Sequence, residues 1–294
     1  MTSRGGDDRP DRPDDRPDRT TRSHDTLRLS GRSVRSARMA EPELVHAAVA
    51  DGVVTITLDS PANRNALSTQ LVADLNAALD VAEAAVADGS GRAIVLTHVP
   101  PAFCAGADLK ERRTGPPDSR PFVRVLQRLM DAEVPTIAAV QGPARAGGVG
   151  LMAACDLVVV RSDITFAFTE VRIGVAAAII SVPVLRRASG SRLASAFLTG
   201  ETFDAHFARE VGLVTHVTDD VDGTVATLCD GIRMGAPRAV AETKRMLRLV
   251  PTLERDEAFE RMRALSDELF ASPDAQEGMA AFAERRRPSW QPPA

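Results

Sequence analysis

The sequence predicts an α/β protein in which short buried strands alternate with helices. Apolar runs with strand-like spacing, such as 54–58 and 157–160, are separated by segments in which apolar residues recur at helical spacing. Such alternation is typical of crossover units packed on a sheet. After about Ala236 the strand-like runs stop and the pattern becomes wholly helical. This change is the best candidate for an internal boundary.

The individual elements follow from the spacing of their apolar residues. Val54, Ile56 and Leu58 alternate with threonines, as in a half-buried strand. Ser68 can cap a helix whose apolar residues recur every three or four positions up to Ala82. The other expected elements are strands at 93–96, around 140, at 157–160 and at 165–168, a small-residue helix at 148–154, and helices through Leu247, Leu265 and Phe282.

The chain divides into three regions by composition. Residues 1–39 are almost all charged, small or proline, so we expect a disordered charged tail. An RNA-binding basic stripe is the alternative there, but interleaved aspartates argue against it. Residues 40–235 would form the α/β core, and residues 236–294 would form a C-terminal helical region.

Composition excludes several classes of protein. A net charge of −4 argues against nucleic acid as the main partner. No apolar run reaches the roughly 18 residues of a membrane span, and no secretory signal is recognisable. Three scattered cysteines do not make a disulfide framework or a zinc site, so we expect a reduced cytoplasmic protein. Tyrosine is absent, which excludes it as an acid or oxyanion donor.

A first loop of small residues follows the strand expected at 93–96. It reads FCAGADL from Phe103 to Leu109. Small residues let the backbone approach a ligand closely, and Asp108 can begin a short helix. The N–H groups at such a helix start have no partners within the helix and can stabilise negative charge. Taken alone, the segment fits a tight turn that binds nothing equally well.

A second glycine-rich loop, QGPARAGGVGL at 141–151, joins a strand to the small-residue helix. Its Gly-Val-Gly is only loosely like a dinucleotide fingerprint, and the loop lacks the Lys-Ser/Thr of a phosphate loop. Two interpretations stay open for this loop alone: it binds a ligand, or it packs a helix closely against a sheet.

Together the two loops resemble the signature of the crotonase superfamily, the enoyl-CoA hydratase/isomerase family. FCAGADLKE at 103–111 resembles the first oxyanion segment of that family, and AAVQGPARAGGVGLMAACD at 138–156 resembles the second. The resemblance covers roughly residues 41 to 290, because three further stretches also match: ITLDSPANRNAL at 56–67, FAFTEVRIG at 166–174 and EGMAAFAERR at 277–286.

The resemblance implies a crotonase-like spiral of ββα units with two roughly perpendicular sheets. It implies a C-terminal helical trimerisation region, with homotrimers that often pair into hexamers, and an acyl-CoA substrate without a further cofactor. Matched motif to motif, the backbone N–H groups of Ala107 and Gly147 would form the oxyanion hole, and Glu170 would be the catalytic acid/base. Two fixed donors stabilise the enolate charge that develops on the thioester oxygen.

The matched motifs contain one departure, at Gly150. Hydratases of the family commonly have a glutamate there, so this chain keeps one of two acids. A single carboxylate can take a proton from water and return it to carbon, which fits hydration of a short-chain or branched 2-enoyl-CoA. The stretch 169–174 favours that reaction. A Δ3,Δ2-enoyl-CoA isomerase and a non-catalytic acyl-CoA-binding or RNA-binding protein are the alternatives, and Glu111 is a weaker candidate for the missing acid.

The resemblance also assigns contacts with coenzyme A. Lys110 is placed to reach a phosphate or the adenine, although a free surface lysine is an equal alternative. Phe282 and one of the arginines at 285–287 would close the site of this subunit or a neighbour, with a solvated helix end as the alternative for the arginines. The expected adenine and pantetheine contacts are Asn65, Ala66, Leu67, Ala105, Asp108 and Leu109.

Other kinds of site find less support in the sequence. Cys104 lies beside the first loop, but none of the five histidines forms a recognisable dyad with it, so we expect a small buried residue. No metal-ligand spacing is present. The expected wall of the acyl pocket, 175–180, is small or aliphatic and fits many chain lengths.

Overall fold

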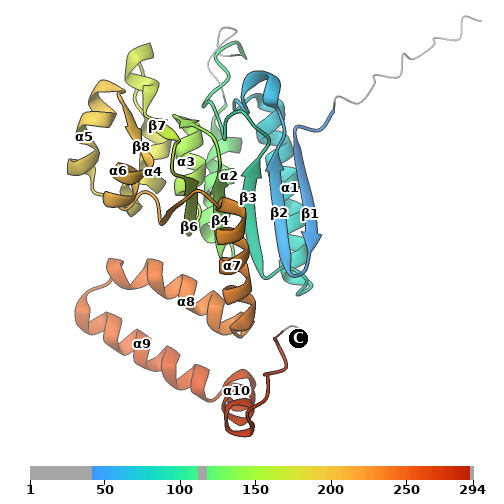
Figure 1. Cartoon of the computed structure of the whole chain (residues 1–294). Helices are drawn as coiled ribbons and strands as arrows, with labels where there is room; N and C mark the ends of the chain where they lie inside the picture. The colour runs from blue at the N-terminus through green and yellow to red at the C-terminus, as the bar shows by residue number, and fades with distance from the viewer. Residues whose placement is uncertain (1–41, 112–117, 292–294) are drawn as a thin grey trace, which may run out of the picture. The chain divides into compact units, whose positions relative to one another are not determined.

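A mainly parallel sheet of six strands forms the centre of the computed structural model, which describes residues 42–111 and 118–291. The strand order is β1-β2-β3-β4-β6-β9, and every neighbouring pair except β1 and β2 is parallel (Figure 1). The strands are β1 (Val45–Ala50), β2 (Val53–Leu58), β3 (Ala93–His98), β4 (Thr136–Val140), β6 (Leu157–Arg161) and β9 (His216–Thr218).

The strands form where apolar residues bury one or both faces. In β2, Val54, Ile56 and Leu58 are fully buried and alternate with partly exposed residues, as their spacing predicts. All five residues of β4 are buried, because helices cover both faces of a parallel sheet at its centre.

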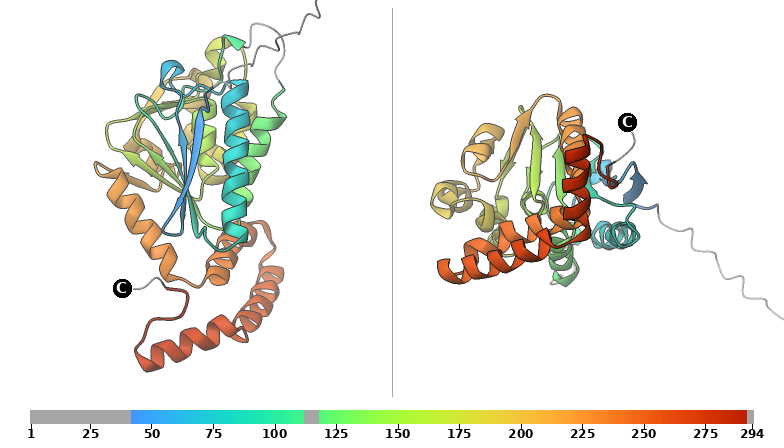
Figure 2. Two further views of the ribbon diagram at one scale, coloured as in Figure 1. Left: turned by 90° about the vertical axis from the view of Figure 1, so that its right-hand side faces the viewer. Right: turned by 90° about the horizontal axis from the view of Figure 1, so that it is seen from below.

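Helices cover the two faces of this sheet (Figure 2). On one face lies α1 (Thr69–Ala87), whose predicted N-cap is confirmed: the Leu71 N–H donates to Ser68 Oγ at 3.1 Å. On the other face lies α7 (Val221–Met234), which packs Val221, Val225 and Cys229 against the sheet. The helices α2 (Arg120–Asp131) and α3 (Gly147–Ala153) complete the core.

A second, smaller sheet has the order β5-β7-β8. Phe168, directly after β7, stacks on Phe197, with ring centroids 3.9 Å apart. This aromatic contact fixes the segment that follows β7. The elements of this part are β5 (Ala144–Arg145), β7 (Thr165–Ala167), β8 (Thr202–Asp204), the 3₁₀ helix η3 (Thr169–Ile173), α4 (Ala178–Arg187), α5 (Gly190–Thr199) and α6 (Ala205–Glu210).

Three helices follow α7: α8 (Pro237–Leu249), α9 (Arg255–Phe270) and α10 (Pro273–Glu284). They belong to the same compact unit as the sheets, residues 42–294. The regional boundary near Ala236 therefore stays a prediction, and the predicted tail, 1–39, lies outside the described residues. No helix in the described ranges combines the length and apolar character needed to cross a membrane.

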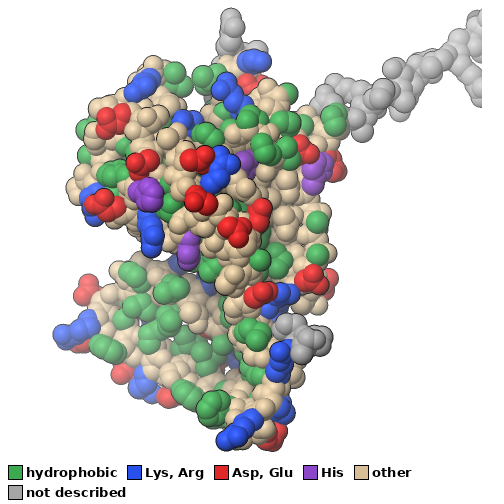
Figure 3. Space-filling model, viewed as in Figure 1, with side chains coloured by type: hydrophobic (Ala, Val, Ile, Leu, Met, Phe, Trp, Pro, Cys, Tyr) green, Lys and Arg blue, Asp and Glu red, His purple; other side chains and the backbone are tan. Residues whose placement is uncertain are grey.

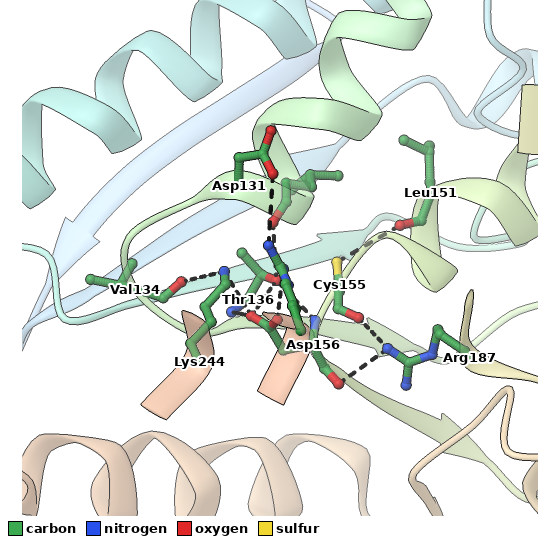
Figure 4. Close-up of polar contacts among 10 residues, drawn as sticks. Asp131, Val134, Thr136, Leu151, Cys155, Asp156, Arg187 and Lys244 are labelled. Atoms are coloured by element: carbon green, nitrogen blue, oxygen red, sulfur yellow. Dashed lines mark hydrogen bonds and ion pairs between the residues drawn. The ribbon is translucent and has the colours of Figure 1, made fainter. Parts of the chain in front are cut away.

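A polar cluster attaches α8 to the core (Figure 4). Asp156, just before β6, accepts from Lys244 Nζ and from Arg248 at 2.8 Å each. The Thr136 N–H donates to the same carboxylate at 2.8 Å, and Lys244 also donates to the Val134 carbonyl at 2.8 Å. The Lys244 side chain is only 7% exposed, so its charge depends on these partners.

Candidate active site

The two glycine-containing loops lie side by side at one edge of the main sheet. They follow β3 and β4, which are parallel neighbours, so both leave the sheet from its carboxyl edge. The Phe103 N–H donates to the Pro143 carbonyl at 3.1 Å, and the Arg145 N–H donates to the Cys104 carbonyl at 3.0 Å. The loops are thus joined by backbone hydrogen bonds.

The glycines are needed where one loop touches the other. A Cβ atom on Gly148 would lie 2.6 Å from the Cys104 carbonyl oxygen. A Cβ on Gly106 would lie 2.8 Å from the Ala146 Cβ, and Gly106 has a φ of +88°, which side chains disfavour. Close packing, the alternative to ligand binding for the second loop, is therefore part of what these glycines do.

A third segment, 65–67, completes the site. The Leu67 N–H donates to the Gly106 carbonyl at 2.7 Å, and the Asp108 N–H donates back to Leu67 at 3.4 Å. A Cβ on Gly147 would lie 2.5 Å from Leu67 Cδ1, so the Leu67 side chain packs directly against the second loop. Three of the predicted site segments are brought together.

The Ala107 and Gly147 N–H groups are unpaired within the part of the chain that the structure describes. Among the hydrogen bonds within the described residues, neither group is a donor, whereas their neighbours Asp108 and Ala146 both are. Gly147 begins α3, where the first N–H has no partner inside the helix. Ala146 takes a φ of +48°, which turns the chain into that helix. Their pairing as one oxyanion hole stays a prediction.

Glu170 lies in η3, next to the second loop. Arg145 of β5 pairs with Ala167 of β7, and the Ala146 N–H donates to the Ala167 carbonyl at 2.9 Å. The Glu170 Oε2 atom is buried without a hydrogen-bond partner among the described residues. Burial raises the pKa of this carboxyl, as its apolar setting in the sequence predicts. A carboxyl with a buried, unpaired oxygen and a raised pKa is suited to moving a proton.

Comparison with known proteins identifies the family of the chain. Residues 48–293 match the family described as enoyl-CoA hydratase/isomerase. The chain belongs to this family. A Thermus thermophilus relative is 38% identical over 248 residues, covering 80% of this chain and 96% of its own. EchA19 of Mycobacterium tuberculosis, named an enoyl-CoA hydratase, is 33% identical over 80% of this chain and 92% of its own.

The fold agrees with the family. A crystal structure of an enoyl-CoA hydratase from Mycobacterium smegmatis covers 85% of this chain and 99% of its own, with a TM-score of 0.78 and 32% identity. The prediction of an α/β crotonase fold with two sheets and C-terminal helices is confirmed.

Gly150, which the resemblance matches to the first acid of family hydratases, lies in a closely packed position. Ile180 of α4 is buried against Gly150 of α3. A Cβ on Gly150 would lie 2.3 Å from Ile180 Cγ2 and 2.7 Å from Ile180 Cβ. A glutamate would therefore require α4 to move. The sequence does not reveal Ile180 as the reason for the glycine, although the aliphatic run at 175–180 contains it.

The side-chain amide of Asn65 is hydrogen-bonded within the protein. Its Oδ1 accepts from the Ser60 N–H at 2.7 Å, and its Nδ2 donates to the carbonyls of Val99 and Ala102 at 3.1 and 2.8 Å. The residue is fully buried. A contact with coenzyme A at 65–67 would therefore use the backbone and not the Asn65 side chain.

The remaining coenzyme A candidates lie in two places. Ala105 is half-buried and its N–H donates to the Arg64 carbonyl at 3.0 Å, while Leu109 and Lys110 are exposed at the end of the first loop. Phe282 is on α10, 87% exposed. The C-terminal helices lie towards the amino ends of the strands, where Arg92 donates to the Gly235 carbonyl, so Phe282 does not meet the loops of its own chain (Figure 1).

Two weaker candidates are engaged elsewhere. Glu111 accepts from both the N–H and the Oγ1 of Thr69 at 2.8 Å, at the start of α1. Cys104 is fully buried, and burial raises the pKa of its thiol to about 12. A thiol of such pKa is a poor nucleophile at neutral pH, as expected for a packing residue.

Proposed function

We propose that this protein is an enoyl-CoA hydratase that adds water to a short-chain or branched 2-enoyl-CoA. The proposal is supported by the N–H groups of Ala107 and Gly147, which are unpaired among the described residues and lie on two loops joined by backbone hydrogen bonds. It is also supported by the buried Oε2 atom of Glu170, three residues after a strand that pairs with the second loop. A thioester provides the carbonyl oxygen for the two donors and the reacting carbons for the carboxyl.

In this mechanism the thioester oxygen accepts hydrogen bonds from Ala107 and Gly147. Glu170 removes a proton from water, whose oxygen bonds to the β-carbon as the double-bond electrons move to form an enolate. The enolate then takes the same proton from Glu170 at the α-carbon, so the product is a 3-hydroxyacyl-CoA. Losing one such oxyanion donor typically costs about 3 kcal/mol of transition-state stabilisation. The reaction needs a coenzyme A thioester as substrate and no further cofactor.

Isomerisation of a 3-enoyl-CoA is the second candidate, favoured by the closely packed position of Gly150. With Ile180 filling that space, the described residues offer Glu170 without the family's usual second carboxylate. Glu170 would remove an α-proton, the two N–H groups would hold the dienolate, and the proton would return to the γ-carbon. No water has to be oriented in this reaction.

The test compares wild type with Glu170→Gln on crotonyl-CoA, 3-methylglutaconyl-CoA and 3-hexenoyl-CoA. The absorbance of the enoyl thioester and the product mass separate hydration from isomerisation. We expect hydration of one of the first two and a loss of about 10²-fold or more in Glu170→Gln. Glu201→Gln, at an exposed glutamate, is the matched control. Hydration that survives in Glu170→Gln would exclude the proposed base, and coenzyme A binding without turnover would indicate a binding protein.

We further propose a homotrimer, or a hexamer built from two trimers, that assembles through the C-terminal helices. The helix α9 buries none of its residues within the chain. Large apolar side chains, including Phe259, Phe270 and Phe282, gather on α9 and α10 (Figure 3). An amphipathic helix without a buried face needs a partner. A cytoplasmic location remains a prediction.

A further inference from the structure

His98 is the last residue of β3, and its ring is hydrogen-bonded to the start of the second loop and to the turn before the first loop. The Gln141 N–H donates to His98 Nε2 at 3.1 Å, at the start of the second loop. His98 Nδ1 lies 3.2 Å from the Val99 carbonyl oxygen, in the turn before the first loop. A backbone N–H can only donate and a carbonyl can only accept, so these partners assign the proton to Nδ1 of a neutral ring.

The ring lies at a point where the two loops are closely packed. A Cβ on Gly142 would lie 2.9 Å from Ala102 Cα and 3.1 Å from His98 Cε1. The imidazole also contacts Phe103 edge to face, with ring centroids 5.5 Å apart. Asn65 holds the Ala102 carbonyl from the other side at 2.8 Å. Any change in the bonds of His98 is therefore transmitted to both loops.

We propose that neutral His98 is a positioning residue that fixes the spacing of the oxyanion donors by joining the turn at Val99 to the loop at Gln141. This inference rests on the proposed function. Ala107 lies beyond the first attachment point and Gly147 beyond the second, so this connection acts together with the backbone hydrogen bonds of Phe103 and Arg145 to set their separation. A proton on Nε2 would remove the acceptor of the Gln141 N–H and set two N–H groups facing each other. The connection between the turn at Val99 and the loop at Gln141 would then be lost, and the spacing of the two donors would change.

The buried surroundings of the His98 ring favour its neutral form. Burial lowers the pKa of His98 below its ordinary 6.5, and the Arg161 charge on β6 lowers it further. The carbonyls of Val99 and Ala102 raise the pKa; each has a smaller effect than burial, although a larger one than the Arg161 charge. On the α7 side, Asp222 accepts from the Gln141 side chain at 2.8 Å and so holds Gln141 in place. The neutral form therefore persists at neutral pH and is lost only in acid.

Two variants separate the two bonds. His98→Gln can place an amide oxygen near the Nε2 position and keep an acceptor for Gln141, whereas His98→Asn can place an amide N–H near Nδ1 and leaves the Gln141 N–H unpaired. His206→Gln, at an exposed histidine on α6, is the control. Acetoacetyl-CoA is the probe, because its bound enolate absorbs in the ultraviolet and reports the oxyanion hole without turnover.

We expect His98→Asn to lower both kcat and acetoacetyl-CoA affinity about tenfold, since it leaves a buried donor unpaired, and His98→Gln to stay within about threefold of wild type at pH 7. On acidification, kcat of wild type should fall with two ionisations, those of His98 and Glu170. In His98→Gln only the Glu170 ionisation should remain, a change that a purely structural role would not produce.

The positioning role would be overturned if the two variants lost equal amounts of kcat and acetoacetyl-CoA affinity. It would also be overturned if kcat of His98→Gln fell on acidification in the same way as kcat of wild type. If His98→Asn unfolds, ¹⁵N-histidine NMR of wild type still decides, because an Nε2–H tautomer at neutral pH contradicts the proposal. This test can fail independently of the proposed reaction. If wild type turns over no enoyl-CoA but its acetoacetyl-CoA binding depends on His98 as described, the hydratase proposal is refuted and the positioning role is kept.

Discussion

Gly150 and Ile180 determine which chemistry the site can offer. Position 150 carries no carboxyl because it is a glycine, whereas the resemblance would place a glutamate there. Ile180 fills the space that such a side chain would need, because a Cβ on Gly150 would lie only 2.3 Å from Ile180 Cγ2. One substitution at Gly150 therefore cannot restore a second acid. The pair must change together, because its members are in direct contact.

This contact predicts a strong coupling between the two positions. Gly150→Glu alone should destabilise the fold by about 1–3 kcal/mol through overpacking. Ile180→Ala alone should cost about 2–5 kcal/mol through a cavity. In the double variant we expect the loss to be smaller than the sum by at least about 1 kcal/mol, measured by denaturant unfolding. Additivity within about 0.5 kcal/mol would show that Ile180 does not fill the acid position.

The raised pKa of Glu170 predicts that the charged carboxylate, which the proposed proton transfer needs, destabilises the folded state. Its folded-state pKa is raised above the ordinary 4.5 by burial, so the native state holds the proton more tightly than the unfolded state. Its contribution to stability is therefore fully present below 4.5 and is lost as pH rises through the raised pKa. Glu170→Gln should be more stable than wild type at pH 7, and the difference should vanish in acid.

Thermal unfolding of the two proteins between pH 4 and pH 8 measures this difference. The control is Glu201→Gln, whose midpoint should follow wild type at every pH. A Glu170→Gln variant that is less stable than wild type at pH 7 would mean that the carboxylate has a favourable partner there.

At the level of elements, long periodic segments are predictable from the sequence and short ones are not. The helix from Ser68 and the strand ending at Leu58 follow from spacing alone. The strand β5 has two residues and β8 has three, too short for a repeating pattern to identify. The helix α2 is absent from the predicted elements, although Val125, Leu126 and Leu129 have the helical spacing that buries them.

The attachment of α8 also depends on contacts that sequence spacing does not reveal. Lys244 and Asp156 are far apart in the chain, and nothing in their local sequence identifies them as a pair. Lys244→Met should cost about 3 kcal/mol, near the low end for breaking a buried ion pair, because Asp156 keeps Thr136 and Arg248. Arg245→Met, which breaks a pair between an arginine that is 68% exposed and a Glu242 that is 16% exposed, should cost less, about 1 kcal/mol.

Denaturant unfolding measures both losses on the same scale. If Asp156 is changed to Asn in the Lys244→Met background, part of the loss should return, because the uncompensated carboxylate is removed. Equal losses for Lys244→Met and Arg245→Met would mean that the cluster in Figure 4 does not hold α8.

At the level of the whole molecule, the two ends of the proposed coenzyme A site lie at opposite edges of the sheet. The loops with Ala107 and Gly147 follow the carboxyl ends of the strands, whereas α10 with Phe282 lies towards their amino ends (Figure 1). The family resemblance identified all of these residues but could not place them relative to one another. Phe282 can serve the site only if it comes from a second copy of the chain.

In the proposed oligomer, assembly and substrate binding would depend on each other. Phe259→Asp with Phe270→Asp, on the unburied helix α9, should convert the oligomer to monomers in light-scattering measurements. The same variant should raise KM for the enoyl-CoA more than it lowers kcat, because Phe282 leaves the neighbouring site while Glu170 stays in place. Val81→Asp, on the exposed side of α1, is the control and should change neither. Monomers with an unchanged KM would show that each chain closes its own site, and Phe282 would then have no part in binding.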